Sequence, residues 1–579
     1  MKKLLIYFKG NRIRAVLAPL FKMFEAIFEL LIPLVVTYII DVGLKENNKN
    51  VLFGMFGVMI ALGVVGLVCA ISAQYFSART AVSFATRLRS SLFSHIQSFD
   101  YETTDKIGTS TLITRMTGDI NSVQTGINMF LRLFMRSPFI VFGAMIMAFT
   151  INVHLALIFV ITILIISIIV FGILIISMPL YKKNQRHLDR VLGKVRSNYT
   201  GVRVIRAFNK EDDEISDFNS KHTELTKTQI FVGRISALLN PLTFVIINMA
   251  IIILIDKGAV SVESGVITQG QLVALYNYMT QILVELIKLA NLIITLNKAA
   301  ASASRISSVF DIPSQAIHTA EKESSNEDLA VEFDNVTFGY TKTGDVAIDT
   351  LNFSVKKGET IGIIGGTGSG KTTLINLIPG FYFPTQGNVF INGKNTALYD
   401  KEELNELIGV VPQKAQLFKG TIRSNLLWGK NDASDGEMWH ALKIAEADSF
   451  VEQKKDKLDE EIKQNGSNLS GGQKQRLTIA RAILKRPEIL IFDDSASALD
   501  YVTESHLREN LKGLDWTPTV FIVSQRASSI LHADKIIVLD DGCIVGCGTH
   551  NDLLDSCDVY REIYDSQFSD IKGGGENEK

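Results

Sequence analysis

The stretch at residues 360–378, TIGIIGGTGSGKTTLINLI, decides the fold of the second half of the chain. Its middle, Gly365-Gly366-Thr367-Gly368-Ser369-Gly370-Lys371-Thr372, fits the pattern G-x-x-x-x-G-K-[ST] and lies between a strand-like and a helix-like run, the context this pattern requires. The glycines let backbone N–H groups wrap phosphate groups, and the start of the helix adds its positive end. We expect the Lys371 ammonium to contact the β- and γ-phosphates of a nucleotide and the Thr372 hydroxyl to bind Mg²⁺.

A second motif follows on a later strand. Residues 489–493, ILIFD, form a buried-strand pattern that ends in Asp493. An Asp at such a strand end holds the Mg²⁺ shell in phosphate-loop nucleotide triphosphatases. Around both motifs, strand-like runs alternate with helical segments from Leu329 onward. The sequence therefore predicts an α/β nucleotide-binding domain over residues 329–566.

The first half of the chain is far more apolar. Hydrophobic residues make up 47% of the whole chain and charged residues only 21%, which is too apolar for a chain that is soluble throughout. Long apolar stretches approach or exceed the ~20 residues that a helix needs to cross a bilayer. We predict six membrane-spanning helices, at about 17–41, 51–77, 130–151, 154–179, 235–256 and 269–293.

The remaining boundaries follow from composition. The polar, aperiodic stretch 313–328 predicts a linker after a transmembrane domain at 1–312, and the tail 567–579 is predicted to be disordered. Lys and Arg concentrate before the first span and in the connections after the second and fourth spans, so the positive-inside rule places both termini in the cytoplasm. The net charge of -1 excludes a global basic field for nucleic acid.

Between the two phosphate motifs lies Leu469-Ser470-Gly471-Gly472-Gln473, which resembles the signature of the ATP-binding-cassette (ABC) family. Together with six preceding spans, the chain resembles a half-size ABC exporter over nearly its whole length. The resemblance implies a six-helix α transmembrane domain, with long cytoplasmic helix extensions, followed by an α/β phosphate-loop ABC nucleotide-binding domain. It also implies ATP and Mg²⁺ as ligands, and a location in the cell membrane.

The resemblance assigns roles to further residues. Tyr340 resembles the aromatic residue that stacks on adenine, and Thr373 extends the nucleotide-binding loop. Gln413 resembles the glutamine that links Mg²⁺ and the attacking water to the membrane domain. The segment Ser497-Ala498-Leu499-Asp500 resembles the loop that touches the partner cassette through Ser497 and Asp500. The cytoplasmic turns near 100–107 and 201–210 correspond to the family's coupling helices.

In the family, the signature of one cassette completes the ATP site of the other, because the start of its helix offers N–H groups to the γ-phosphate. One chain with one cassette therefore implies a dimer. The signature Leu469–Gln473 would act on the partner's nucleotide.

Two positions depart from the family pattern. Asp494 stands where the family usually has the Glu that polarises the attacking water, and Gln525 stands where it has a His. Misplacing a carboxylate by about an ångström can cost ~100-fold in rate, and Gln cannot become a cation near neutral pH. Both changes together predict the degenerate-site subunit of a heterodimeric exporter with a second half-transporter chain. The alternative is a homodimer with two slow sites.

The sequence says less about the cargo. Ionisable residues within spans are functional candidates, which singles out Glu29 and Glu285, although Lys288 can pair with Glu285 on one helix face. Arg132 and Arg136 lie near enough to the inner boundary of the membrane for their side chains to snorkel to it. The resemblance favours multidrug export of amphipathic compounds from the lipid bilayer. Lipid, peptide or iron-chelate cargo, an ATP-gated channel and a regulatory ATPase stay open.

Overall fold

Long apolar helices fill the first half of the chain in the computed structural model, which describes residues 2–313, 328–340 and 346–572. Within these residues, six helical segments are long and apolar enough to cross a membrane. They are Arg12–Leu44, Lys49–Gln97, Thr109–Ile151, Val153–Thr200, Glu211–Glu263 and Gln269–Phe310. Each contains one predicted span, so the prediction of a six-helix transmembrane domain is confirmed.

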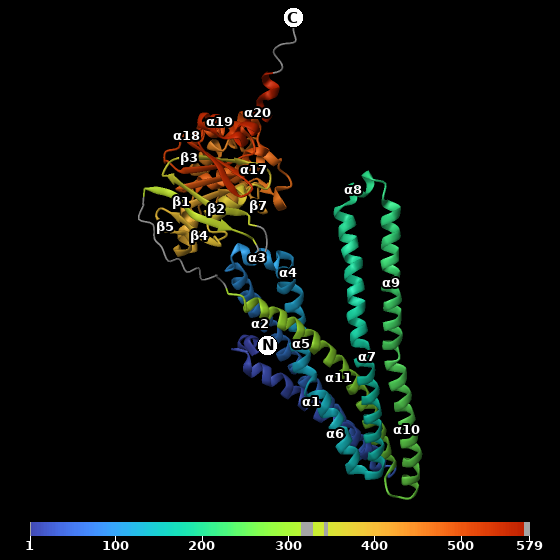
Figure 1. The fold of residues 1–579 in the computed structure, drawn as a ribbon. Coiled ribbons are helices and arrows are strands. Elements are labelled where there is room, and N and C mark those ends of the chain that lie inside the picture. The colour runs from blue at the N-terminus through green and yellow to red at the C-terminus, as the bar shows by residue number, and fades with distance from the viewer. Residues whose placement is uncertain (1, 314–327, 341–345, 573–579) are drawn as a thin grey trace. The chain divides into compact units, whose positions relative to one another are not determined.

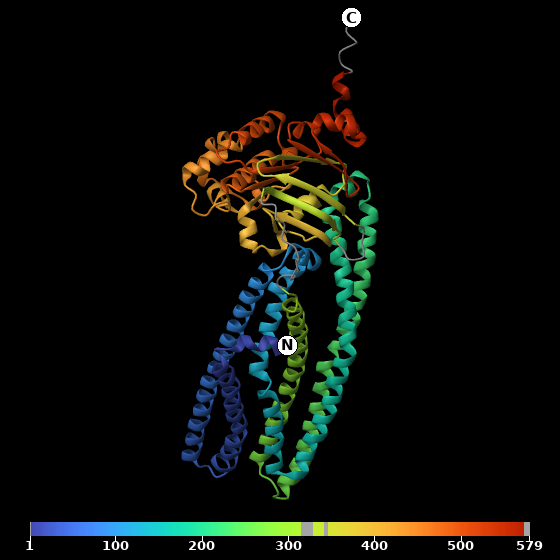
Figure 2. The same cartoon turned by 60° about the vertical axis from the view of Figure 1, so that its left-hand side comes forward.

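Several of these segments combine more than one helix (Figure 1). After η1 (Lys2–Phe8) the elements are α1 (Arg12–Tyr38), η2 (Ile39–Leu44), α2 (Lys49–Gln97), α4 (Thr109–Thr114), η3 (Arg115–Asp119), α5 (Ile120–Leu133), α6 (Arg136–Ile151), α7 (Val153–Thr200), α8 (Val202–Ala207), α9 (Glu211–Ala237), α10 (Leu239–Glu263) and α11 (Gln269–Phe310). The long helices α7 and α9 run side by side with the short helix α8 at their tip (Figures 1 and 2).

Local sequence signals set where these helices begin. The Asn152 side chain accepts hydrogen bonds from the N–H groups of His154 and Leu155 and so caps α7. Thr268 and Gln271 form a reciprocal capping box at the start of α11. Inside the bundle, side chains from α1, α6, α7, α10 and α11 form one buried apolar cluster, which includes Phe159 and Tyr278.

The chain divides into two compact units. The first consists of Met1–Ser98 and Gly108–Pro313, and the second of Phe99–Ile107 and Ser314–Lys579. The short helix α3 (Tyr101–Ile107) therefore belongs to the second unit, although the sequence boundary placed it in the first. Its contacts explain this: the Tyr101 ring lies 4.4 Å from the Phe381 ring, and the Tyr382 hydroxyl donates a hydrogen bond to Asp105.

The rest of the second unit is built on two larger sheets and one small one. The six-stranded sheet has the order β12-β11-β3-β10-β9-β6 and is parallel except for β12. An antiparallel sheet has the order β2-β1-β4-β5, and β7 pairs with β8. Strands β3 and β9 are almost continuously buried, as expected for parallel strands covered on both faces.

The strands are β1 (Leu329–Phe338), β2 (Ile348–Lys356), β3 (Thr360–Gly365), β4 (Gln386–Ile391), β5 (Lys394–Asn395), β6 (Ile408–Val411), β7 (Gly420–Thr421), β8 (Glu461–Ile462), β9 (Ile489–Asp493), β10 (Thr519–Val523), β11 (Lys535–Asp540) and β12 (Cys543–Gly548). The helices are α12 (Lys371–Leu377), η4 (Thr396–Leu398), α13 (Lys401–Leu407), α14 (Ile422–Leu426), α15 (Asp435–Ile444), α16 (Asp448–Glu452), η5 (Lys457–Asp459), η6 (Gln464–Gly466), α17 (Gly471–Leu484), η7 (Ser495–Ala498), α18 (Tyr501–Lys512), η8 (Ala527–Ser529), α19 (His550–Ser556) and α20 (Asp558–Lys572). The predicted α/β fold is therefore confirmed.

The predicted tail, residues 567–579, and the predicted linker, residues 313–328, lie partly outside the residues that the structure describes. Helix α20 continues to Lys572, so residues 567–572 of the predicted disordered tail are helical. Residues 573–579 of that tail lie outside the described residues. Residues 314–327 of the predicted linker do so as well.

Candidate active site

The phosphate loop joins the carboxyl end of β3 to the start of α12, as the sequence predicts. Two of its glycines have no room for a side chain. A Cβ atom on Gly365 would lie 2.1 Å from the Leu539 carbonyl oxygen, and one on Gly370 would lie 2.8 Å from that of Ala347. Gly370 also has φ +94°, which favours glycine. The loop is therefore a backbone cradle open to phosphate groups.

Lys371 lies at the centre of this cradle and is 9% exposed. Its Nζ donates hydrogen bonds to the carbonyl oxygens of Gly365 at 2.9 Å and Gly366 at 2.6 Å, and to Ser369 Oγ at 3.2 Å. Burial lowers the pKa of this ammonium, because removing it from water disfavours its charged form. The nearby carboxylates of Asp494 and Asp493 act in the opposite direction but do not outweigh burial, and an anionic phosphate would add further counter-charge.

Thr372 and Asp493 are two of the three residues predicted to hold Mg²⁺, the third being Gln413. The Thr372 hydroxyl donates to the Asp493 carboxylate at 3.2 Å, although 121 residues separate them in the sequence. Burial raises the pKa of Asp493, and the neighbouring Asp494 carboxylate adds to this. A hydroxyl and a carboxylate are hard oxygen ligands of the kind Mg²⁺ takes, so these residues fit that ion.

Asp494 is held from three directions. Its backbone has φ +43°, and its N–H donates to the Val523 carbonyl oxygen at 3.0 Å. The Gln413 Nε2 donates to its carboxylate at 3.2 Å, and the Ser497 hydroxyl donates to its carbonyl oxygen at 2.7 Å. The structure thus brings Asp494, Gln413 and Ser497 together.

Gln525 follows the end of β10 and is exposed. The segment around it is fixed by a residue that the sequence did not single out, Gln567 on α20. The Gln567 amide donates to the Gln525 carbonyl oxygen at 2.8 Å and accepts from the Ala527 N–H at 2.8 Å. No local pattern signals this contact, because it forms only when α20 packs against η8.

Tyr340 and Thr373 meet at another edge of the site. Their hydroxyl oxygens lie 3.0 Å apart, and Tyr340 is 49% exposed. The ring centroid of Tyr382 lies 5.3 Å from that of Tyr340. The exposed ring of Tyr340 is thereby fixed next to the phosphate loop, where it can stack on a base.

The signature begins helix α17. Ser470 and Gln473 form a capping box there, and Leu469 is 8% exposed. A Cβ atom on Gly471 would meet nothing within 4 Å, while one on Gly472 would lie 3.1 Å from the Ala498 carbonyl oxygen. The signature therefore leaves an open backbone surface beside the segment of Ser497.

Two further residues tie these motifs together. The buried amide of Gln475 on α17 donates to the Pro412 carbonyl oxygen at 3.1 Å, which joins the signature helix to the residue before Gln413. The Asp500 carboxylate accepts from the Thr503 N–H at 3.2 Å and its hydroxyl at 2.7 Å, so it caps α18. Gln475 lies directly beyond the signature, but its partner could not be read from the sequence.

In the first unit, Glu29 and Glu285 meet at Arg136. The Arg136 guanidinium lies 2.6 Å from each carboxylate, and Glu285 also accepts from Ser137 at 2.7 Å and Lys288 at 2.8 Å. Arg136 is 7% exposed, so the expectation that it snorkels to the boundary is wrong. Two carboxylates from α1 and α11 hold it inside the bundle instead.

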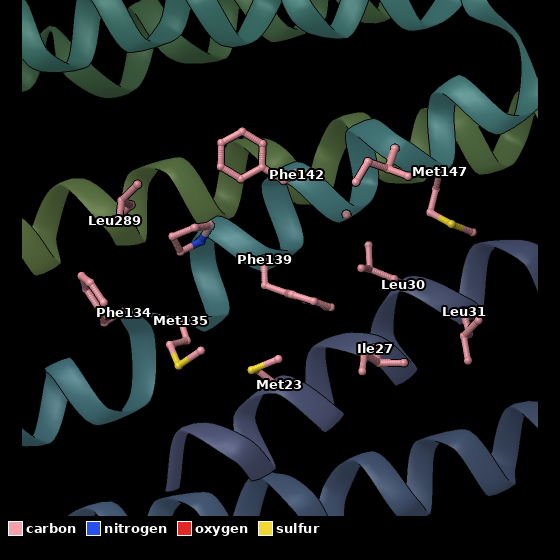
Figure 3. A pocket seen from close by; sticks show the side chains of 13 residues that line it. Met23, Ile27, Leu30, Leu31, Phe134, Met135, Phe139, Phe142, Met147 and Leu289 are labelled. Carbon is pink, nitrogen blue, oxygen red and sulfur yellow. The ribbon is translucent and has the colours of Figure 1, made fainter. Parts of the chain in front are cut away.

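An apolar cavity of about 700 Å³ lies beside this network (Figure 3). The side chain of Phe139 on α6 points toward those of Met23 and Ile27 on α1, and Phe142 and Met147 of α6 also line the cavity. The other lining residues are Leu30, Leu31, Phe134, Met135, Pro138, Gly143, Ile146 and Leu289. Neither Glu29 nor Glu285 is among them.

Comparisons with known proteins agree with this architecture. Residues 16–286 match the ABC transporter transmembrane region family, and residues 348–497 match the ABC transporter family. The uncharacterized ABC transporter ATP-binding protein YfiB of Bacillus subtilis (strain 168) is 34% identical over 570 residues, with 98% of this chain and 99% of YfiB covered. A Rickettsia conorii protein, named for export ATP-binding and permease functions, is 30% identical over 93% of this chain and 94% of its own length.

A solved structure of a bacterial Atm1-family ABC exporter with ATP bound has the same fold. It covers 99% of this chain and 100% of its own, with a TM-score of 0.82 and 23% identity. Six membrane helices, the phosphate loop and the match to export proteins make this chain a multi-pass membrane protein that hydrolyses ATP to drive export. The chain belongs to the ABC transporter family.

Proposed function

We propose that this chain is the degenerate-site half of a heterodimeric ABC exporter for amphipathic compounds. The observation that carries the proposal is the combination of Asp494 and Gln525 in a site that is otherwise complete. The cradle, the buried Lys371 and the Thr372–Asp493 pair support ATP and Mg²⁺ binding. Mg²⁺ bound there would neutralise charge on the phosphates.

The geometry around Asp494 supports slow hydrolysis at this chain's own site. Gln413 and Ser497 hold Asp494 at the carboxyl end of β9. Its side chain is one methylene shorter than that of Glu, so its carboxylate reaches less far toward an attacking water. A displacement of about 1 Å can cost on the order of 100-fold in rate. Gln525 offers an amide and no proton for exchange.

The signature supports a role across the dimer. The start of α17 has an open backbone surface at Gly471, and helix N-termini attract anions. We propose that Ser470–Gln473 completes the hydrolytic site of a second half-transporter chain, with Ser497 and Asp500 at the interface. In the same arrangement, α3 and α8 act as coupling helices.

The first experiment measures particle mass and ATP turnover of this chain alone, reconstituted in lipid. We expect negligible turnover of the chain alone. In the pair assembled with the chain that co-purifies with it, we expect the double variant Asp494→Glu/Gln525→His to raise hydrolysis at this chain's own site by on the order of 100-fold. Asp494→Asn/Gln525→His is the matched control, because it restores the imidazole without a carboxylate. A stable homodimer of the natural chain that turns over several ATP per second would overturn the proposal.

The cavity between α1 and α6 supports an amphipathic or apolar cargo. Six of its thirteen lining residues are Phe or Met, and such side chains adapt to varied apolar ligands. Glu29 keeps a partly exposed carboxylate, with 36% of its side chain accessible, and is the candidate contact for a cationic group. Glu285, with 3% accessible, can serve only if its ion pairs open.

Binding of rhodamine 6G, a lipophilic cation, tests the cargo class. We expect Phe142→Ala to weaken dye binding several-fold, because Phe142 lines the cavity. The control is Phe244→Ala, since Phe244 on α10 is similarly exposed, at 64% against 59%, but is not among the lining residues. Equal dye affinity in both variants would remove this cavity from the proposal.

The orientation is also a proposal. The bias of Lys and Arg supports placing both termini and the nucleotide-binding domain in the cytoplasm of a cell whose plasma membrane holds the exporter. Membrane-impermeant maleimide should then fail to label the exposed thiols Cys543 and Cys547 in intact cells and should label them after permeabilisation. Labelling in intact cells would contradict this orientation.

A further inference from the structure

We propose that the nucleotide-binding unit carries a second ligand site, for a small organic anion with an apolar body. The site is a cavity of about 280 Å³ between α18 and the amino-terminal ends of β3 and β10. Thr360 and Val520, at the start of these two strands, form part of its wall. The phosphate loop leaves the opposite, carboxyl end of β3, so the two sites are separate.

The charged groups around the cavity favour an anion. Arg508 and Lys512 lie one turn apart on α18, and His532 adds an imidazole. One Nη of Arg508 donates to the Ser528 carbonyl oxygen at 3.1 Å, and a guanidinium has five N–H groups to offer. The carboxylate in the lining, Asp534, already accepts the Thr360 N–H at 2.8 Å.

A buried hydroxyl in the same wall lacks a partner. Ser529 is 4% exposed, and its Oγ is without a hydrogen-bond partner among the residues that the structure describes. Burying a hydroxyl in this way costs free energy unless a partner is supplied. The Oγ itself is closed off in this rotamer, so a carboxylate oxygen in the cavity would accept its proton once the Ser529 side chain turns toward the cavity that it lines.

The remaining wall explains why the anion needs an apolar body. Leu511, Leu514 and Pro518 line it, together with Trp516, whose indole N–H already donates to the Pro487 carbonyl oxygen at 3.1 Å. The indole therefore offers the cavity its apolar surface. The volume lies near the lower end of the range for small-molecule sites, which fits a compact aryl or alkyl acid.

The position of the cavity connects it to the ATP site. A smaller cavity of about 40 Å³ shares Arg508, Leu511, Ile522 and Ser529 with it and extends to Glu504 and to Ser495, the residue after Asp494. Helix η8, which ends at Ser529, begins two residues after Gln525. A bound acid would thus contact the helix that Asp500 caps and the segment that follows Gln525.

The test is calorimetric titration of the purified full chain with 1-naphthaleneacetate, in buffer free of phosphate and sulfate. 1-Naphthaleneacetamide has the same shape without the charge and serves as the ligand control. We expect saturable binding of the acid, and an affinity for the acid about tenfold or more above that for the amide. Partitioning into detergent is measured with detergent alone and subtracted. Lys443→Gln, at an exposed lysine outside the cavity, is the control for the loss of one positive charge and should bind the acid like the natural chain.

Three variants sharpen the test. Arg508→Gln and Lys512→Gln should each weaken binding of the acid by about tenfold, and Lys512→Gln keeps the Ser528 contact if the first variant folds poorly. Ser529→Ala should weaken binding several-fold and yet leave the melting temperature of the ligand-free chain unchanged or higher. Equal affinity for acid and amide, unchanged affinity in the two charge variants, or no saturable binding would overturn the proposal. Each readout is independent of the cargo and of the dimer.

Discussion

Lys371 in the nucleotide-binding unit is 9% exposed and Arg136 in the membrane unit is 7% exposed, but their surroundings differ. The acceptors of Lys371 are two carbonyl oxygens and a hydroxyl. Arg136 faces the carboxylates of Glu29 and Glu285 at 2.6 Å, with Glu25 at 3.7 Å. The hydrogen-bond acceptors of Lys371 are neutral, and the charges of Asp494 and Asp493 nearby do not outweigh the effect of its burial, so this site still favours an added anion. Arg136 is already compensated by carboxylates in direct contact.

This difference separates a ligand site, at Lys371, from a structural clamp. The clamp is the ion-pair network of Arg136, Glu29 and Glu285, which holds helices together. Burial lowers the pKa of Lys371 and raises the pKa of Asp493, so each group is strained toward its neutral form. A nucleotide with Mg²⁺ would relieve both. The network of Arg136 instead joins three helices, α1, α6 and α11, that are distant in the sequence.

The largest expected effect is on the clamp. Arg136→Ala leaves Glu285 buried without its main partner, and breaking a buried ion pair from one side costs about 3–5 kcal/mol. We expect a large drop in the melting temperature of the membrane unit, measured by thermal denaturation in detergent, and unchanged ATP affinity. The double variant Arg136→Gln/Glu285→Gln should recover part of the loss. A stable Arg136→Ala protein would show that the network is not a clamp.

The second effect is on the cradle. Lys371→Ala removes hydrogen bonds to two phosphates, each charge-assisted, and should weaken ATP binding by at least about 100-fold. The melting temperature without nucleotide should change little or rise, because a buried cation has been removed. A fluorescent ATP analogue measures the affinity, with Lys357→Ala at an exposed turn as control. If Lys371→Ala bound the ATP analogue as tightly as the natural chain does, Lys371 would not be part of a ligand site.

The third effect is on the pH dependence of ATP binding. Because the pKa of Lys371 lies below the usual lysine range, its charge is lost as the pH rises toward that range, and affinity should fall by up to about tenfold per pH unit. The raised pKa of Asp493 acts at the other end: Mg²⁺ affinity should fall as the pH drops through a value above the usual Asp range. Titrations with ATP and with Mg²⁺ at a series of pH values measure both affinities. Affinities that do not change with pH would contradict the shifted pKa values of Lys371 and Asp493.

The smallest effect is expected for Lys288, which forms the most accessible ion pair of Glu285. Lys288 contacts the same Glu285 carboxylate as Arg136 does, at 2.8 Å, but 42% of its side chain is accessible. Its ammonium is less enclosed by the protein than the Arg136 guanidinium, so Lys288→Gln should lower the melting temperature less than Arg136→Ala does. A loss as large as that of Arg136→Ala would mean that burial does not set the strength of these pairs.

Some of the site could be predicted because its signals are local. The glycines before Lys371, at this spacing, are typical of a phosphate loop. The position of Asp493 at a strand end follows from the apolar run before it. The six spans follow from length and hydropathy alone. Gln475, Gln567 and the partners of Arg136 could not be predicted, because each contact joins residues 42 or more positions apart.

The sequence by itself determined the two-part architecture, the phosphate loop and the departures at Asp494 and Gln525, since these rest on residue types at fixed spacing. Only the tertiary structure decided which charges are compensated. Glu285 looked like a candidate for cargo until α6 placed Arg136 and Ser137 against it. The second cavity beside α18 also appeared only there, where Ser529 is buried without a partner in the described residues. Burial and pairing are properties of packing, and no single segment of the chain carries them.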